Sequence, residues 1–253
     1  MQSLRKELRL DLLDLIYHSG GGHLGGSFSS LDLMIAVCFG EIFNLKLDKF
    51  ILSAGHLAPA LYVVLAHAGY FPKEYLSSYA SFGSILQGHI STETPGVNYS
   101  SGLLGQGLSF SAGLAIGSSN HIICLTTDGE HQEGQVWEAA QFAAKYHLGN
   151  LINIVDVNRY QIGGSTDEIM PQGDLAAKYV RFGWTVTEVD GHNFGKITSA
   201  LKKATHSNYP NCIIAHTVFG SGLSFAKNNH KYHDVKNLSE DLYLCAQRDL
   251  NKL

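Results

Sequence analysis

The sequence predicts an α/β fold built on a doubly wound parallel sheet with helices on both faces. From Ile122 onward, short apolar runs alternate with segments of helical spacing, which is the order of βαβ units. The apolar run Ile122–Thr126 is followed by Asp128-Gly129-Glu130, and the run Leu151–Val155 is followed by Asp156-Val157-Asn158. Parallel strands end at one edge of a sheet, so we expect these polar residues to meet there.

Each element follows from local periodicity. Helices are expected where apolar residues recur at helical spacing, and strands where a short apolar run is bounded by turn residues. In the first half, helices are expected over Leu4–Tyr17, Leu31–Phe43, Ala58–Ala68, Lys73–Tyr79 and Leu108–Ile116. The alternating half comprises strands Ile122–Thr126, Leu151–Val155, Thr185–Val189 and Asn211–Thr217, and helices Gln135–His147, Leu175–Arg181, Gly195–Thr205 and Val235–Leu250. The segment Ile162–Gly173 is expected to be a mobile loop.

Composition excludes several classes of function. The 253 residues carry a net charge of −4, so no basic surface for nucleic acid is expected. No apolar run approaches the roughly 20 residues of a membrane span, and Leu4–Ile16 mixes both charge signs, unlike a signal peptide. The four cysteines lack metal spacing and are expected to fill the core. We therefore expect a cytoplasmic protein with one domain over residues 1–253, and its charged fraction of only 16% favours a large buried interface.

Two oxygen-bearing side chains follow neighbouring strands and predict a Mg²⁺ site. Asp128 and Asn158 bracket one βαβ unit, so their side chains are expected at the same sheet edge. Mg²⁺ prefers oxygen ligands and usually shares them with substrate or cofactor phosphates. The backbone carbonyl of Tyr160 could supply a third oxygen.

Glycine clusters and single histidines mark the loops of the first half. Gly20–Gly26 and Gly102–Gly107 are expected where the backbone approaches a ligand or takes a positive φ, as in phosphate cradles. Gly105-Gln106-Gly107 precedes an expected helix, whose first N–H groups favour an anion. Histidines in several of these loops offer hydrogen-bond donors and proton relays near neutral pH. Four isolated histidines are given no role: His67, His121, His147 and His206.

In these features the chain resembles the thiamin-diphosphate enzymes of the transketolase type. Asp128–Ala139, with Leu148–Leu151 and Asp156–Ile162, is similar to that family's cofactor motif. Three expected loops also match, over His18–Ser27, Phe50–His56 and Leu86–His89. Further matching segments are Thr94–Val97, Ser101–Leu108, Phe182–Trp184, Val189–Asn193, Ser224–Asn229 and Tyr232–Asp234. Thr127, Ile90 and Asp234 stand where the family commonly has glycine, proline and glycine.

The resemblance implies a role for each matching residue. Mg²⁺, or Ca²⁺ or Mn²⁺ in its place, would be held by Asp128, Asn158 and the carbonyl of Tyr160. Thiamin diphosphate would be bound through its diphosphate by Gly129 N–H, His56 and His233, and elsewhere by Gly102, Leu104, Glu130, Asn158 and Ile162. Catalysis would involve His233 together with His23 and His89, which would bind the donor sugar and relay protons. Glu133 and Glu138 would lie at a subunit interface, whereas their residue type alone is equally consistent with solvated helix charges.

The resemblance also implies a reaction and a partner. Full-length members of the family follow this diphosphate domain with a pyrimidine-binding domain and a third domain, which this sequence lacks. We therefore expect the N-terminal subunit of a split transketolase, joined in an α2β2 assembly by a C-terminal subunit that carries the pyrimidine-binding domain. The expected reaction transfers a two-carbon ketol unit from a ketose phosphate to an aldose phosphate, with thiamin diphosphate supplying the carbanion chemistry.

Two alternatives stay open at the level of sequence. A deoxyxylulose-phosphate synthase would share the cofactor motif, although Leu86–His89 favours a transketolase. A catalytically silent subunit that binds thiamin diphosphate or a partner is kept open by Thr127, Ile90 and Asp234, although every expected metal and histidine position is intact.

Overall fold

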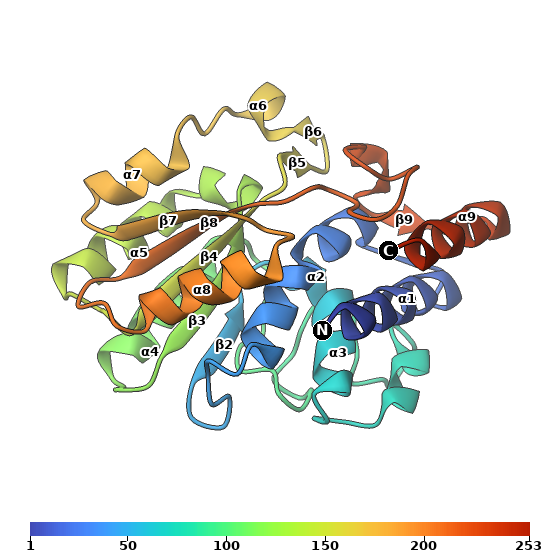
Figure 1. The fold of residues 1–253 in the computed structure, drawn as a ribbon, viewed down its shortest axis with the longest axis horizontal. Helices are drawn as coiled ribbons and strands as arrows, with labels where there is room; N and C mark the ends of the chain where they lie inside the picture. The colour runs from blue at the N-terminus through green and yellow to red at the C-terminus, as the bar shows by residue number, and fades with distance from the viewer.

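The computed structural model describes all residues from 1 to 253 and contains a five-stranded parallel sheet (Figure 1). The strand order is β2 (Lys49–Leu52), β3 (Ile122–Thr127), β4 (Leu151–Val157), β8 (Asn211–His216) and β7 (Thr185–Asp190). Every neighbouring pair is parallel. The predicted α/β class with a doubly wound sheet is therefore confirmed, and β2 is a strand that the sequence analysis missed.

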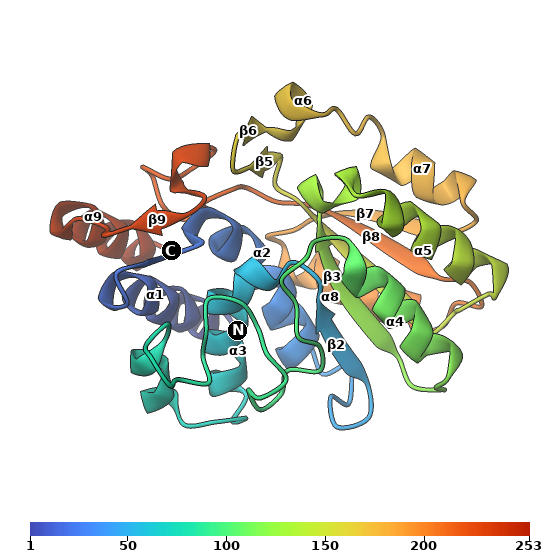
Figure 2. The ribbon, with the colours of Figure 1, turned by 180° about the vertical axis from the view of Figure 1, so that it is seen from behind.

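Helices cover both faces of the sheet (Figures 1 and 2). One face carries α4 (Gln106–Ile116), α5 (Gly134–Lys145) and α7 (Leu175–Arg181), and the other carries α2 (Leu24–Phe39) and α8 (Phe194–Ala204). Helices α1 (Gln2–His18) and α3 (Ala58–His67) pack against α2 and against each other. Strand alternation divides the core accordingly. In β4, Ile152 and Ile154 join the α1–α2–α3–α8 cluster, whereas Leu151 and Val155 join the α4–α5–α7 cluster.

Helix α2 begins seven residues before its predicted start at Leu31 and ends at Phe39 rather than Phe43. Glycine and serine have low helix propensity, so the segment from Gly25 to Ser30 did not indicate a helix. Burial explains why it is one, since every residue from Leu24 to Val37 is buried. A methyl group at Gly25 would overlap the ring of Phe219, so this close packing requires glycine.

Three further predictions of secondary structure differ from the structure, two in the type of element and one in where the helix begins. Phe50–Leu52, expected in a loop, belongs to β2, and Lys73–Ser78 forms a 3₁₀ helix rather than an α-helix. Val235–Lys236 is a short strand, β9, that pairs with β1 (Gly21–Gly22). The closing helix α9 (Glu240–Asn251) starts only after Ser239, whose side chain accepts a hydrogen bond from Leu242 N–H.

The segment expected to be a mobile loop contains regular structure. Strands β5 (Tyr160–Gln161) and β6 (Gly164–Ser165) pair as a hairpin, and α6 (Thr166–Ile169) follows. Ser165 and Glu168 form a reciprocal capping box at the start of α6. The remaining short elements are the 3₁₀ turns Gly55–Leu57, Gly129–Gln132 and His230–Tyr232.

Of the four cysteines, Cys124 and Cys212 are buried in the α4–α5–α7 cluster, as expected for core residues, whereas Cys38 and Cys245 are partly exposed. All four are free thiols. None of the helices combines the length and apolar character that crossing a membrane requires.

Candidate active site

The ends of β3 and β4 bring Asp128 and Asn158 together, as predicted. Asp128 N–H donates to the carbonyl of Asp156 at 3.1 Å, continuing the strand pairing beyond Thr127. The Asp128 carboxylate accepts hydrogen bonds from Arg159 N–H at 2.7 Å and Gly129 N–H at 2.8 Å. The amide oxygen of Asn158 accepts from Tyr160 N–H at 2.9 Å. The three expected metal-binding residues therefore lie in one hydrogen-bonded turn.

Asp128 is buried without a cationic partner. Its exposed fraction is 3%, and it forms no ion pair with any lysine, arginine or histidine. Burial, reinforced by the nearby negative charge of Asp156, raises the pKa of Asp128 to about 7. A buried carboxylate of this kind fits a divalent cation, which would supply the missing positive charge.

Thr127 does not disturb the backbone at this position. It is the last residue of β3, where a β-branched side chain is favoured, and it is absent from the residues with positive φ. The sequence departure from glycine therefore leaves the path into Asp128 intact.

Glu130 ties the glycine-rich loop to the end of β3. Its carboxylate is fully buried and accepts hydrogen bonds from the Ser53 hydroxyl, Gly105 N–H at 2.7 Å and Thr127 N–H at 3.2 Å. The Gly107 N–H donates to Ser53 Oγ at 3.0 Å. Two N–H groups at the start of α4, where we expected a ligand anion to be favoured, are thus used by Glu130 and Ser53.

Four histidines from separate loops surround one point. His23 is the N-cap residue of α2, His56 lies in the turn before α3, His89 in the following loop, and His233 after the turn His230–Tyr232. The His23 ring centroid lies 5.0 Å from that of His56, 5.5 Å from that of His233 and 6.0 Å from that of His89. The sequence prediction that these loops converge is therefore correct in geometry.

The environment of the histidines favours their neutral forms. Burial, together with the nearby His23, lowers the pKa of His233 to about 4. Burial also lowers the pKa of His23 and places that of His56 well below its ordinary value. The Nδ1 atom of His233 is buried and has no hydrogen-bond partner, although the ring stacks on Phe219. Such an unpartnered ring nitrogen fits a site that receives a polar ligand.

These groups line a cavity of about 360 Å³ at the carboxyl edge of the sheet. Its lining includes most of the predicted site residues: His23, His56, His89, Gly102, Leu104, Gly129, Glu130, Glu133, Asn158, Tyr160, Ile162 and His233. Asp128 lies directly behind Gly129, to whose N–H its carboxylate is bonded. That bond also means that Gly129 N–H, expected to reach a diphosphate, is engaged by Asp128 in this structure.

The sequence analysis missed several lining residues, of which Phe219 is the most informative. Phe219 is fully buried, and its ring lies 5.5 Å from that of Tyr160. Its only sequence signal was its position just after β8, whose carboxyl end reaches the same sheet edge. Of the two glutamates expected at an interface, Glu133 lines the cavity and Glu138 does not, and both residues are exposed.

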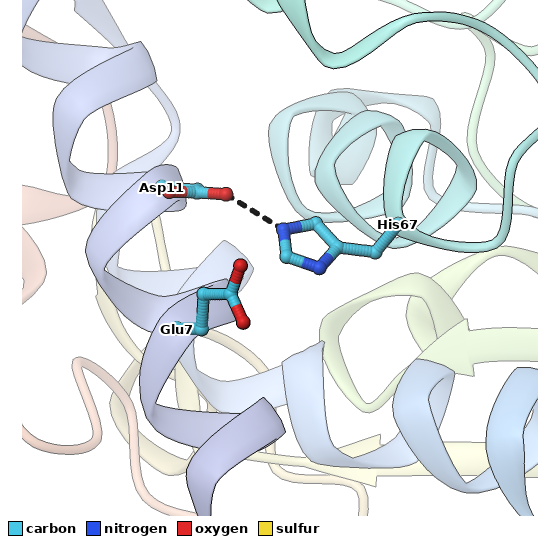
Figure 3. Close-up of side chains that lie close together, drawn as sticks. All are labelled: Glu7, Asp11 and His67. Atoms are coloured by element: carbon cyan, nitrogen blue, oxygen red, sulfur yellow. Dashed lines mark hydrogen bonds and ion pairs between the residues drawn. The ribbon is translucent and has the colours of Figure 1, made fainter.

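A second group of potential metal ligands lies between α1 and α3 (Figure 3). His67 Nε2 pairs with Asp11 Oδ2 at 2.6 Å, and the nearby Glu7 pairs with Lys73 Nζ at 2.9 Å. Since the atoms that could bind a metal already pair with protein groups, we interpret this cluster as a contact between helices. His67, to which the sequence analysis gave no role, thus joins α3 to α1.

Comparisons with known proteins agree with these features. The family model described as transketolase, thiamine diphosphate binding domain, matches residues 2–247. The 6-deoxy-6-sulfo-D-fructose transketolase subunit of Clostridium sp. (strain MSTE9) is 36% identical, covering 100% of this chain and 96% of that subunit. An apulose-4-phosphate transketolase subunit of Phocaeicola vulgatus is 35% identical, covering 89% of this chain and 85% of its own length.

Longer proteins match over part of their length. The crystal structure of transketolase from Campylobacter jejuni superposes with a TM-score of 0.91 and 28% identity, over 99% of this chain and 42% of that one. Human transketolase is 33% identical over 96% of this chain and 41% of its own length. The chain thus spans about two-fifths of these longer proteins, but most of the two relatives that are named as subunits.

Proposed function

Because the chain belongs to the transketolase family through its thiamine diphosphate binding domain, we propose that it forms the diphosphate-binding half of a two-chain transketolase active site. The observation that carries this proposal is the convergence of four histidines with Gly129, Asn158 and Tyr160 on one cavity, with the Asp128 carboxylate hydrogen-bonded behind Gly129. Neutral imidazoles beside buried oxygen ligands suit a site that receives an anionic, metal-bound cofactor.

In this proposal Asp128, the amide oxygen of Asn158 and the carbonyl of Tyr160 hold Mg²⁺. When bound, thiamin diphosphate supplies a carbon nucleophile and an electron sink for cleaving and forming carbon–carbon bonds. His233 offers its free Nδ1 to a diphosphate oxygen, and His56, packed beside it with 5.5 Å between ring centroids, offers a second donor. Both rings are neutral near pH 7 because burial lowers their pKa values, so each can donate through one nitrogen only.

His23 and His89 face the sugar in this arrangement. His89 belongs to a separate loop and contacts the cluster only through His23, with which it forms an edge-on pair. Burial lowers the pKa of His23, so its ring is neutral near pH 7 and can accept a proton from a substrate hydroxyl. His89 can then donate or accept at the next position, which gives a two-imidazole relay for the donor and acceptor sugars.

A second polypeptide completes the site. The two relatives that match over most of their length are named as subunits, which favours a C-terminal subunit that carries a pyrimidine-binding domain. Leu103 and Ile162, beside or at the rim of the cavity, are 69% and 71% exposed, an arrangement that favours a covering protein surface. Glu133 and Glu138 would contact the same partner, in an α2β2 assembly.

The proposed reaction is transfer of a two-carbon ketol unit from a ketose to an aldose, at least one of them with an anionic end. The relatives are named for a sulfonated ketose and for apulose 4-phosphate, both of which are anionic sugars. The cavity in this chain holds no lysine or arginine, so the sugar's anionic group would be bound by the partner.

Calorimetric titration of thiamin diphosphate with Mg²⁺ into the assembled complex tests the binding half of this proposal. Asn158→Ala should weaken cofactor binding strongly, because it removes a metal ligand. Asn208→Ala, which changes the same residue type outside the site, serves as the control and should leave the affinity unchanged. Equal affinities for the wild type and Asn158→Ala would show that the metal site has been assigned to the wrong residues.

A further inference from the structure

Asp156 is a buried carboxylate surrounded by hydrogen-bond donors. Its exposed fraction is 0%, and it forms no ion pair. The hydroxyl of Ser29 donates to Oδ2 at 2.6 Å, and those of Ser30 and Thr217 donate to Oδ2 and Oδ1. These donors come from α2 and from the segment after β8, so the carboxylate is fixed from two sides of β4.

The fourth donor to this carboxylate is the amide of Asn158. Asn158 Nδ2 lies 3.3 Å from Asp156 Oδ2 and 3.3 Å from Ser29 Oγ, and because these two atoms are only 2.6 Å apart, one amide hydrogen is shared between them. Asn158 Oδ1 accepts from Tyr160 N–H at 2.9 Å and therefore lies on the opposite side, toward the cavity that Asn158 and Tyr160 line. The residue as a whole is 4% exposed, so water offers no alternative partners.

We propose that Asp156 is a positioning residue that fixes the amide orientation of Asn158, so that its oxygen rather than its NH₂ group faces the metal. This inference rests on the proposed function, because it assumes that Asn158 binds a divalent cation. An ionised carboxylate can only accept hydrogen bonds, so it selects the NH₂ end of the amide. The two ends of an amide are nearly equal in size, and only hydrogen bonding distinguishes them.

The opposite orientation is excluded by the same contacts. Rotating the Asn158 amide by half a turn would place its oxygen against the Asp156 carboxylate and its NH₂ against Tyr160 N–H. The hydrogen bonds of the amide with Asp156 and Tyr160 would be lost, and an NH₂ group would point at the cation. The contacts of Nδ2 depend on Asp156 and on Ser29, whose hydroxyl lies between the Asp156 carboxylate and the carbonyl of Gly26.

Asp156→Asn is the direct test, because it keeps the shape of the side chain and removes its acceptor-only character. The new amide can offer NH₂ to Asn158, which allows the flipped orientation. We expect the affinity for Mn²⁺ in the presence of thiamin diphosphate to fall about 10- to 100-fold, the usual effect of changing a group that orients a metal ligand. The free Mn²⁺ signal in electron paramagnetic resonance, recorded on the assembled complex, measures this affinity without turnover.

The double variant Asp156→Asn/Asn158→Asp separates orientation from general damage. It exchanges the two side chains, keeps the net charge, and places at position 158 a carboxylate that presents oxygen in either orientation. We expect Mn²⁺ affinity to recover about tenfold or more relative to Asp156→Asn. Thr217→Val, which only removes a hydroxyl from the carboxylate, is a milder test if Asp156→Asn folds poorly, and it should weaken Mn²⁺ binding a fewfold.

The outcomes distinguish a failure of the proposed metal site from a failure of the positioning role of Asp156. If wild-type complex binds no Mn²⁺, the proposed function is wrong, and this inference fails with it. If wild type binds Mn²⁺ and a folded Asp156→Asn binds it equally well, the proposed metal site stands and the positioning role is wrong. A loss in Asp156→Asn that the exchange variant does not recover would also overturn the positioning role, because it would indicate a loss of structure or charge instead of orientation.

Discussion

Asp128→Asn should leave the fold at least as stable as the wild type while removing its response to metal. The reason is the burial of an unpaired charge. The pKa of Asp128 is raised from 3.8 to about 7, so the folded chain disfavours the ionised form. Since the folded pKa lies above the unfolded one, stability is greatest at low pH and is lost as pH rises from about 4 to 7. At pH 7 the cost is on the order of 4 kcal/mol.

The substitution also has an opposing effect. The carboxylate accepts two backbone hydrogen bonds, from Gly129 and Arg159, whereas an amide can accept through its single oxygen only. Losing one hydrogen bond to a charged group costs about 1.5–3 kcal/mol. Subtracting this cost from the cost of the buried charge leaves a gain in unfolding free energy of about 1–2.5 kcal/mol at pH 7 for the metal-free chain. Metal-dependent stabilisation, about 2.7 kcal/mol when the ligand is at 100 times its Kd, should disappear.

Urea unfolding at pH 7, with and without Mg²⁺ and thiamin diphosphate, measures both effects. Asp167→Asn is the matched control, since it removes an exposed carboxylate from α6 and should change stability by less than about 0.5 kcal/mol. A metal-free Asp128→Asn chain that is less stable than wild type by more than about 0.5 kcal/mol, the range expected for the control, would refute the reasoning, because Asp128 would then be a structural residue. A ligand-induced gain equal to that of wild type would refute it equally.

Three other substitutions test separate parts of the account. In the assembled complex, His233→Ala should weaken thiamin diphosphate binding roughly ten- to a hundredfold, whereas His89→Ala should keep that affinity and lower turnover about 10²–10⁴-fold. Calorimetry measures the affinity, and turnover at saturating cofactor measures catalysis. Identical behaviour of the two variants would contradict their division into a diphosphate role and a sugar role. Gly107→Ala should lower the unfolding free energy by about 1–3 kcal/mol in a urea titration, because its methyl group would overlap the buried Ser53. Gly113→Ala, on the open face of α4, should raise it by about 0.5–1 kcal/mol. The reverse order would mean that α4 packs differently. Burial lowers the pKa of His131 from 6.5 to about 4, so its contribution to stability is complete above pH 6.5 and is lost as pH falls. His131→Leu should therefore flatten the decline of the unfolding free energy between about pH 7 and 5. An unchanged slope would show that this histidine is not buried as a neutral ring.

The sequence predicted best those parts of the fold whose hydrophobic pattern indicates one type of secondary structure. Strands β3, β4 and β8 are largely apolar runs, because helices cover both of their faces, and the boundaries of all four strands in the second half differ from prediction by two residues at most. The start of α2 could not be predicted, because its glycines and serines are helical only through tertiary packing against Phe219 and Asp156. Strand β2 was missed because four residues carry too little periodicity.

In the candidate site, too, some residues could be predicted from the sequence and some contacts could not. The strand order placed Asp128 and Asn158 at one edge of the sheet, whereas the four histidines were singled out through the family resemblance. Glu130 was expected to contact the cofactor, and the hydrogen bonds of its carboxylate with Ser53, Gly105 and Thr127 were not expected. Contacts of this kind join segments far apart in the chain, and nothing in the local sequence indicates them.

The central claim is that this chain supplies half of an active site, and a complementation assay tests it most directly. Ketol transfer should be measured with thiamin diphosphate and Mg²⁺ for the chain alone, for a partner subunit that carries a pyrimidine-binding domain, and for mixtures of the two. We expect no transfer from either chain alone, and activity in mixtures that rises until the subunits are equimolar. Robust ketol transfer by this chain alone would contradict the claim, as would an inactive mixture in which the two subunits form a stable complex loaded with cofactor.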